Sequence, residues 1–378
     1  MAESLNVEAV QARHFLRRVQ HIDQPFAEVG AALSYLGYVQ IDPLNICGRM
    51  HDLILRNRVS GYREGDLTRH LHGADASLAS APRTAFEHHL PDTNVLVAFP
   101  LEAWPHLQAA FRARPKRTSA WSGRLTPRER ELVPRILAEI AARGPLSSDA
   151  IDDDNRRGQR AWGTATLAKA TLQKLFFHGR VLIARRDGIR RIYDLPERVL
   201  PRETLAQPEM PASDTARWLA VLKLRQRRLV LLKRQELLLV SDLVQPVRLS
   251  DVDAPMLHCL RADVPLLEAA AESIAPPEES AATVRLLAPL DPLIYDRRVT
   301  RAVWDFDYTW EAYTPAHKRV RGHYALPVLV GTQIVGHVEP KADRVARKLV
   351  VASRRLRRGY SAVPAVRELA QWLGLRAR

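Results

Sequence analysis

The sequence predicts an α+β protein, and three patterns lead to this prediction. Apolar residues recur at helical spacing through much of residues 1–285, and a strong β-hairpin signal interrupts them at residues 180–195. Short runs rich in β-branched and aromatic residues then occupy much of residues 286–378. Helical spacing and short β-rich runs between turn residues are the main sequence signals for the two kinds of element. We expect four consecutive domains, at residues 1–115, 124–201, 212–285 and 286–378.

The first domain is predicted to be mainly helical. Amphipathic patterns at residues 12–19 and 29–36 indicate two helices, and Gly37 ends the second. A polar pair, Gln40 and Asp42, follows, and in an extended segment side chains two residues apart point to the same side. Two interpretations of Asp42 remain open. With Pro43 it can start a third helix as the N-cap, or it can carry out chemistry together with Gln40.

The second domain has the pattern of a winged helix. A helix is predicted to begin at Thr126-Pro127 and to end at Gly144. Ser147 and Ser148 cap a short acidic helical turn, and a second main helix runs from about Thr164 to Phe177. Two strands follow, joined by Asp187-Gly188, which is a strong short-range hairpin signal. Three helices followed by a hairpin form the winged-helix variant of the helix-turn-helix. The hairpin bears four arginines and one acidic residue within seven positions, which suits either phosphate contact or a solvated sheet edge.

The remaining domains are predicted with less detail. A long helical pattern covers residues 216–240, and residues 274–280 have the composition of a linker. Strands are expected at residues 283–287, 324–330 and 333–338, and a final helix at residues 363–373.

Composition limits the function classes. The chain carries 57 Lys and Arg against 42 Asp and Glu, a net charge of +15, which favours nucleic acid or an anionic membrane surface. No apolar run approaches the roughly 18 residues of a membrane span. The two cysteines, Cys47 and Cys259, fit a reducing cytoplasm and lack metal-ligand spacing. We therefore expect a cytoplasmic protein without a metal site. Because the sequence has no phosphate-cradling Gly-Lys motif and no dinucleotide fingerprint, we expect no cofactor either.

Three blocks of sequence resemble the YcaQ/AlkZ family of bacterial winged-helix DNA glycosylases. They are QID at residues 40–42, YDLPERVLP at residues 193–201 and a long block that begins with LAPLDPL at residue 287 and ends with KADR at residue 344. Their order over some 300 residues makes the resemblance specific. It implies tandem winged-helix domains followed by a C-terminal β-barrel-like domain, with a basic surface for double-stranded DNA.

The resemblance further implies hydrolysis of the N-glycosidic bond of N3- or N7-alkylated purines and unhooking of alkylated interstrand crosslinks. The catalytic motif of the family falls on Gln40 and Asp42, with Asp42 activating water and stabilising the positive sugar and Gln40 holding the water or the lesion. No lysine adjoins the motif, so we expect a monofunctional glycosylase without lyase chemistry. We expect a monomer associated with the nucleoid.

Ten basic residues are predicted to contact DNA. They lie after the motif, on the wing and in the fourth domain: Arg49, His51, Arg56, Arg185, Arg186, Arg190, Arg191, Lys318, Arg319 and Arg321. For His51, a packed structural histidine is the alternative. The main competing hypothesis for the whole chain is a winged-helix transcription regulator that binds DNA without altering it. Such a regulator needs neither Gln40-x-Asp42 nor the β-rich C-terminal block.

Overall fold

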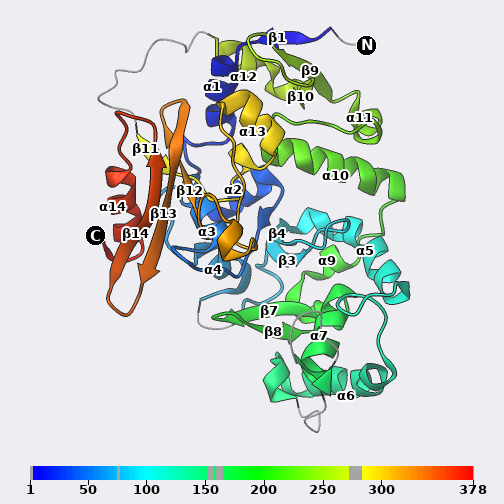
Figure 1. The fold of residues 1–378 in the computed structure, drawn as a ribbon. Coiled ribbons are helices and arrows are strands. Elements are labelled where there is room, and N and C mark those ends of the chain that lie inside the picture. The colour runs from blue at the N-terminus through cyan, green and yellow to red at the C-terminus, as the bar shows by residue number, and fades with distance from the viewer. Residues whose placement is uncertain (1–2, 75–76, 152–156, 159–164, 272–282, 378) are drawn as a thin grey trace. The chain divides into compact units, whose positions relative to one another are not determined.

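The computed structural model describes residues 3–74, 77–151, 157–158, 165–271 and 283–377 (Figure 1). The predicted linker at residues 274–280 lies outside them. The chain forms two compact units, each described by itself below. Unit 1 consists of Met1–Leu36, Asp42–Asp66 and Ala216–Arg378, and unit 2 consists of Gly37–Ile41 and Leu67–Thr215. Among the described residues, no helix has the length and apolar character needed to cross a membrane.

Unit 2 begins with a small antiparallel sheet. Strand β2 (Val39–Gln40) pairs with β4 (Leu96–Pro100), which pairs in turn with β3 (Ala85–His89). Helices α4 (Asp66–His72) and α5 (Trp104–Ala113) precede and follow this hairpin in the chain. All five residues of β3 are buried, so neither face of this strand shows the alternation of polar and apolar residues by which a strand is recognised. The largely helical first domain predicted from the sequence was wrong in omitting this sheet.

The second half of unit 2 contains the predicted helices and hairpin. Helix α6 (Pro127–Arg143) begins at Thr126, whose side chain accepts a hydrogen bond from the Glu129 amide while Glu129 accepts one from the Thr126 amide. This capping box and the left-handed Gly144 (φ 85°) set the two ends where the sequence placed them. Helix α7 (Leu167–Phe177) follows.

The predicted hairpin is confirmed as β7 (Leu182–Asp187) paired antiparallel with β8 (Arg190–Asp194). Gly188, with φ 60°, lies in the tight turn between them. Short helices α8 (Pro196–Val199) and α9 (Arg202–Leu205) and the short strands β5 (Arg157–Gly158) and β6 (Ala165–Thr166) complete the described elements of this unit.

Unit 1 contains a five-stranded sheet that is open at its edges. The strand order is β11 (Val284–Leu286), β12 (Leu326–Val330), β13 (Gln333–Asp343), β14 (Lys348–Leu356) and β15 (Arg376–Ala377). Helix α14 (Val363–Trp372) contacts β11 at one edge and both β14 and β15 at the other. The sheet therefore curls around this helix as a half-barrel, and Figure 1 shows its two long strands beside α14.

The rest of unit 1 joins the start of the chain to its last third. Strand β1 (Leu5–Val7) pairs parallel with β9 (Val244–Leu249), which pairs with β10 (Leu257–Leu260). One apolar core unites this sheet with helices from both parts of the chain. The α-helices of unit 1 not yet given are α1 (Ala9–Val19), α2 (Val29–Leu36), α3 (Met50–Leu55), α11 (Arg234–Val240), α12 (Val264–Ala269) and α13 (Arg297–Trp304). Helix α10 (Ala212–Arg227) begins at the end of unit 2 and belongs to unit 1 from Ala216 onward.

An ion pair with no exposed area fixes these parts of unit 1 to one another. Arg58, just beyond α3, donates to both carboxylate oxygens of Asp291 at 2.6 and 2.9 Å. Both side chains have 0% exposure. Asn57 beside it donates to the Leu286 carbonyl at 2.9 Å. The segment that carries Asp42 is thus held to the C-terminal block by buried polar contacts as well as by apolar packing.

Two helix predictions need correction. The helix after the motif begins at Met50 and not at Pro43, because residues 43–49 form bends and an isolated bridge. The long pattern at residues 216–240 is two helices, because Arg228 adopts a left-handed conformation (φ 63°) and ends α10. The final helix, predicted at residues 363–373, is confirmed. The four consecutive domains stay a prediction, since one compact unit can contain several domains.

Candidate active site and DNA-contacting residues

Asp42 is a buried carboxylate with few partners. It has 7% exposure, and its Oδ1 accepts a hydrogen bond from the Leu44 amide at 2.9 Å. This is a local turn rather than a helix cap, because α3 starts eight residues later. Burial raises the pKa of Asp42, and the hydrogen bonds from Leu44 and Tyr313 oppose that shift only in part. The predicted helix N-cap was therefore wrong, and no helix dipole holds this carboxylate ionised.

Tyr313 is a partner of Asp42 that the sequence did not reveal. Its hydroxyl donates to Asp42 Oδ2 at 3.3 Å, although the two residues are 271 positions apart. The Tyr313 ring is 73% exposed and meets the Trp310 ring edge-on, with centroids 5.4 Å apart. Tyr313 is thus an exposed residue that contacts a buried carboxylate. No local pattern could have shown this, because the contact joins two distant parts of the chain.

A second buried carboxylate shapes the segment that carries Tyr313. Glu311, at 6% exposure, accepts hydrogen bonds from the amides of Val320, Arg321 and Gly322 at 2.9, 2.7 and 3.2 Å. Burial by itself would raise the pKa of Glu311, but these three amides and the Arg321 guanidinium outweigh it and lower that pKa. The ionised carboxylate therefore ties the two ends of residues 311–322 together and fixes the base of the loop from which Tyr313 projects.

Gln40 is the last residue of β2 and belongs to unit 2, whereas Asp42 belongs to unit 1. Its backbone pairs with Val97 of β4. The side-chain Oε1 is buried and has no hydrogen-bond partner among the described residues. A buried amide oxygen without a partner is uncommon, since most such groups are satisfied. It is an acceptor available to a water molecule or to a substrate.

The predicted DNA contacts near α3 are largely occupied within the protein. His51 is 4% exposed, with its Nε2 3.7 Å from an Asp52 carboxylate oxygen, so it has the packed environment of the structural alternative. Arg56 donates to Glu368 of α14 at 2.7 Å and lies over the Trp372 ring at 5.2 Å. Its side chain is 5% exposed. Arg49 precedes α3 and is partly exposed.

The four wing arginines have different surroundings. Arg186 binds both carboxylate oxygens of Glu87 on β3, and His72 contacts the same carboxylate at 2.6 Å. Burial would raise the pKa of Glu87, but Arg186 and His72 lower it well below its ordinary value. Arg186 is therefore held inside unit 2 as a structural cation. The other three are Arg185, which is partly exposed, Arg190, which is 3.4 Å from Asp149, and Arg191, which lies over the Phe176 ring at 5.7 Å.

The basic residues of the fourth domain lie around the loop that Glu311 organises. Lys318 is exposed at the end of a short 3-10 turn. Arg319 donates to the Thr314 carbonyl at 2.8 Å, and Arg321 donates to the Asp307 carbonyl at 2.7 Å. Lys318 and Tyr313 thus lie on one loop, and of the two it is Tyr313 whose side chain contacts Asp42. In the described parts of the chain, no group of three His, Cys, Asp or Glu side chains could hold a metal ion.

Comparison with known proteins identifies the family of the chain. The family described as DNA glycosylase AlkZ-like matches residues 33–375. Among solved structures, the DNA glycosylase AlkZ of Streptomyces sahachiroi is similar over 99% of this chain and 100% of its own, with a TM-score of 0.60 and 15% sequence identity. At 15% identity, this similarity is evidence for a common fold and not for a common function. The family match covers most of the sequence, and the chain therefore belongs to the AlkZ-like DNA glycosylase family.

Proposed function

We propose that this protein is a monofunctional DNA glycosylase that releases N3- and N7-alkylated purines and unhooks alkylated interstrand crosslinks. The observation that carries the proposal is Asp42, a buried carboxylate with two hydrogen bonds and an exposed aromatic partner. A weakly satisfied carboxylate of raised pKa is suited to accept a proton, because its charged form is less stabilised than in water. Family membership supports the reaction class.

The departing base requires little acid catalysis from the enzyme. Alkylation at purine N3 or N7 makes the base cationic, so it departs as a neutral base when its bond to the sugar C1′ breaks. The C1′ then carries oxocarbenium character, which a nearby carboxylate stabilises as in glycoside hydrolysis. Water forms the new bond to C1′ and loses its proton to Asp42. The unpaired Oε1 of Gln40 would accept from this water or from the lesion.

Tyr313 has a positioning role in this scheme. Its hydroxyl holds one oxygen of Asp42 while the Leu44 amide holds the other. Two donors on different oxygens fix the plane of the carboxylate. The exposed ring is at the same time available to the DNA, so substrate binding and the orientation of Asp42 are linked through one side chain.

Base release from N7-methylguanine DNA tests the proposal. The wild-type protein is expected to produce alkali-labile abasic sites, and Asp42→Asn to lose about 10²–10⁴-fold in the single-turnover rate, the usual range for general base catalysis. DNA affinity should be kept or increased, because a negative charge near phosphate is removed. The exposed Asp253→Asn is the matched control and should react at the wild-type rate. Normal release by Asp42→Asn would refute the assignment.

A monofunctional enzyme leaves the abasic strand intact. The described hydrogen-bond partners of Asp42 are Leu44 and Tyr313, and neither carries the amine that a Schiff base requires. Borohydride added during turnover should therefore trap no covalent protein–DNA species. A trapped species of the size of the protein plus one strand would contradict this part of the proposal without affecting base release.

The organisation implied by the resemblance is also proposed: tandem winged-helix domains, action as a monomer on damaged double-stranded DNA, and a place in the bacterial cytoplasm at the nucleoid. Helices α6 and α7 followed by the β7–β8 hairpin support one such domain. A transcription regulator without catalysis is the second candidate, and the match to a glycosylase family weighs against it. DNA binding with no base release from alkylated DNA would favour the regulator.

A further inference from the structure

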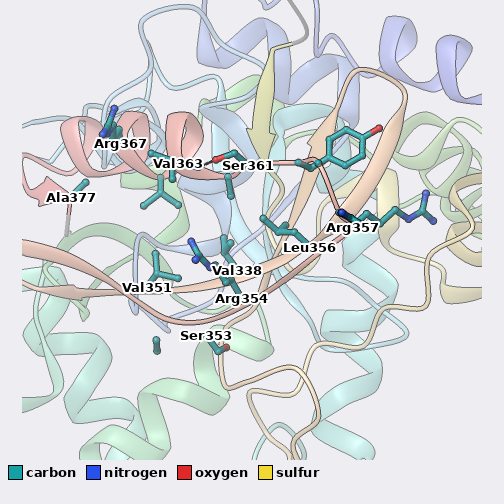
Figure 2. A pocket seen from close by; sticks show the side chains of 16 residues that line it. Val338, Val351, Ser353, Arg354, Leu356, Arg357, Ser361, Val363, Arg367 and Ala377 are labelled. Carbon is teal, nitrogen blue, oxygen red and sulfur yellow. Dashed lines mark hydrogen bonds between the residues drawn. The ribbon is translucent and has the colours of Figure 1, made fainter. Parts of the chain in front are cut away.

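A pocket of about 890 Å³ lies between β14 and the start of α14, away from the partners of Asp42. In Figure 2, the labelled lining residues come from β14 (Val351, Ser353, Arg354 and Leu356) and from the start of α14 and the residues before it (Ser361, Val363 and Arg367). Its sixteen lining residues include four arginines and no aspartate or glutamate. Such a concentration of one charge in a hollow attracts an anion, because a concave wall of low dielectric focuses the field.

The arginines come from three different parts of the chain and are mostly unneutralised. They are Arg354 on β14, Arg357 and Arg358 on the connection, and Arg367 on α14. Arg357 is 3.2 Å from Asp305. Among the described residues, no carboxylate lies within ion-pair distance of Arg354, Arg358 or Arg367. All three of these exposed cations line the same pocket.

The ordinary role of edge arginines does not explain this arrangement. The outer edge of β14 pairs with β15 only at Lys348 and Leu349, so beyond Leu349 no described strand covers it. Charged side chains on such an edge discourage pairing with another chain. That role needs no hollow and no contribution from α14. The pocket, the cation from α14 and the N-terminal end of this ten-residue helix, which also favours an anion, are additional features.

The opposite face of β14 continues the basic surface. Because side chains alternate along a strand, Arg354 lines the first pocket and Arg355 a second one, of about 270 Å³. The second pocket is also lined by Arg321, Arg357 and His337 and by one acidic residue, Asp307. A row of cations thus passes over the end of β14 from one pocket to the next, as expected for a ligand with repeated anionic groups rather than for a single small ion.

We propose that the β14–α14 pocket binds the phosphate backbone of duplex DNA outside the lesion. Val351, Val363 and Tyr360 supply apolar surface for the sugars between phosphates. The inference rests on the proposed function in that DNA is the substrate. It adds a site in unit 1 that is separate from Asp42 and from the wing.

The salt dependence of DNA binding tests the site. Binding of an undamaged 30-bp duplex is measured between 50 and 300 mM salt for the wild-type protein and for Arg354→Gln/Arg358→Gln/Arg367→Gln. Each lost phosphate contact reduces the slope of log K against log salt by about 0.9, so the triple variant should lose about 2 to 3 units. The matched control is Arg18→Gln/Arg202→Gln/Arg297→Gln, which removes three exposed arginines that line neither pocket. It should lose less than one unit.

Two further measurements separate the outcomes. The lysine triple, Arg354→Lys/Arg358→Lys/Arg367→Lys, keeps the charges and should retain a slope within one unit of wild type, whereas a folding defect would change it as much as glutamine does. Equal slopes for the glutamine triple and its control would refute the pocket. Base release by the wild-type protein is assayed separately, so a protein without glycosylase activity contradicts the proposed function while the slopes still decide on the pocket.

Discussion

Removal of one member of the Arg58–Asp291 pair should destabilise unit 1 strongly. Asp291→Asn takes away the negative charge that Arg58 contacts at 2.6 and 2.9 Å, in a place where neither side chain has exposed area. The Ile54 carbonyl, at 3.0 Å, and the Gln20 amide oxygen would remain, and neither carries a charge. An uncompensated buried charge costs about 3–5 kcal/mol. For a unit of this size, the midpoint of thermal unfolding should fall by about 10 °C.

A double-mutant cycle measures the pair itself. Denaturant unfolding is followed by tryptophan fluorescence, with Trp304 in the core of the same unit as a reporter. Arg58→Met leaves the Asp291 carboxylate unpaired and should cost as much as Asp291→Asn. The double variant removes both charges, so it should be more stable than the sum of the two single losses predicts, by at least 2 kcal/mol. Single losses under 1 kcal/mol, or a double variant that simply adds them, would refute this reasoning.

Two other predictions concern pH and ion pairing. Burial raises the pKa of Asp42 and the Tyr313 hydroxyl partly lowers it, so Tyr313→Phe should move the acid limb of the base-release rate to higher pH. Tyr295→Phe, outside both proposed sites, should leave that limb in place. An unmoved limb in Tyr313→Phe would contradict the contact. Glu87→Gln should cost unit 2 about 3–5 kcal/mol at pH 7 by leaving Arg186 unpaired. Since the pKa of Glu87 is lowered on folding, its stabilisation is present above the unfolded value near 4.3 and is lost as pH falls through the lowered folded value. Urea unfolding of both proteins should therefore converge only in strong acid, and a difference that is constant with pH would argue against the ion pair.

Local signals in the sequence were sufficient where neighbours in the chain determine the structure. The start of α6 at Thr126, its end at Gly144 and the hairpin turn at Gly188 all follow from residues within a few positions of one another. Such features depend on capping and on backbone conformation, which a short stretch of sequence specifies. The α+β class and the family resemblance were likewise accessible, and the comparisons confirm both.

Long-range contacts were not accessible in this way. Strand β3 is buried on both faces, so it lacks alternation, and its Glu87 is compensated by Arg186 from a hairpin 99 positions away. Arg186 therefore looked like a surface cation in the sequence. The same limit applies to Tyr313, whose contact with Asp42 has no local pattern. The roles of Gln40 and Asp42 in catalysis stay predictions.

Unit 1 is assembled from segments that are far apart in the sequence, and this has a consequence for synthesis of the chain. Its first segments end at Asp66, but its core needs strands and helices from Ala216 onward. At translation rates of about 5–20 residues per second, roughly eight to thirty seconds separate the emergence of Asp66 from that of Ala216 at the ribosome. During that interval the apolar residues of α1 and α3 have no native partners to cover them. Chaperones that bind nascent chains would therefore meet this protein first at the segment that bears Asp42, and a chain truncated before residue 216 would expose it permanently.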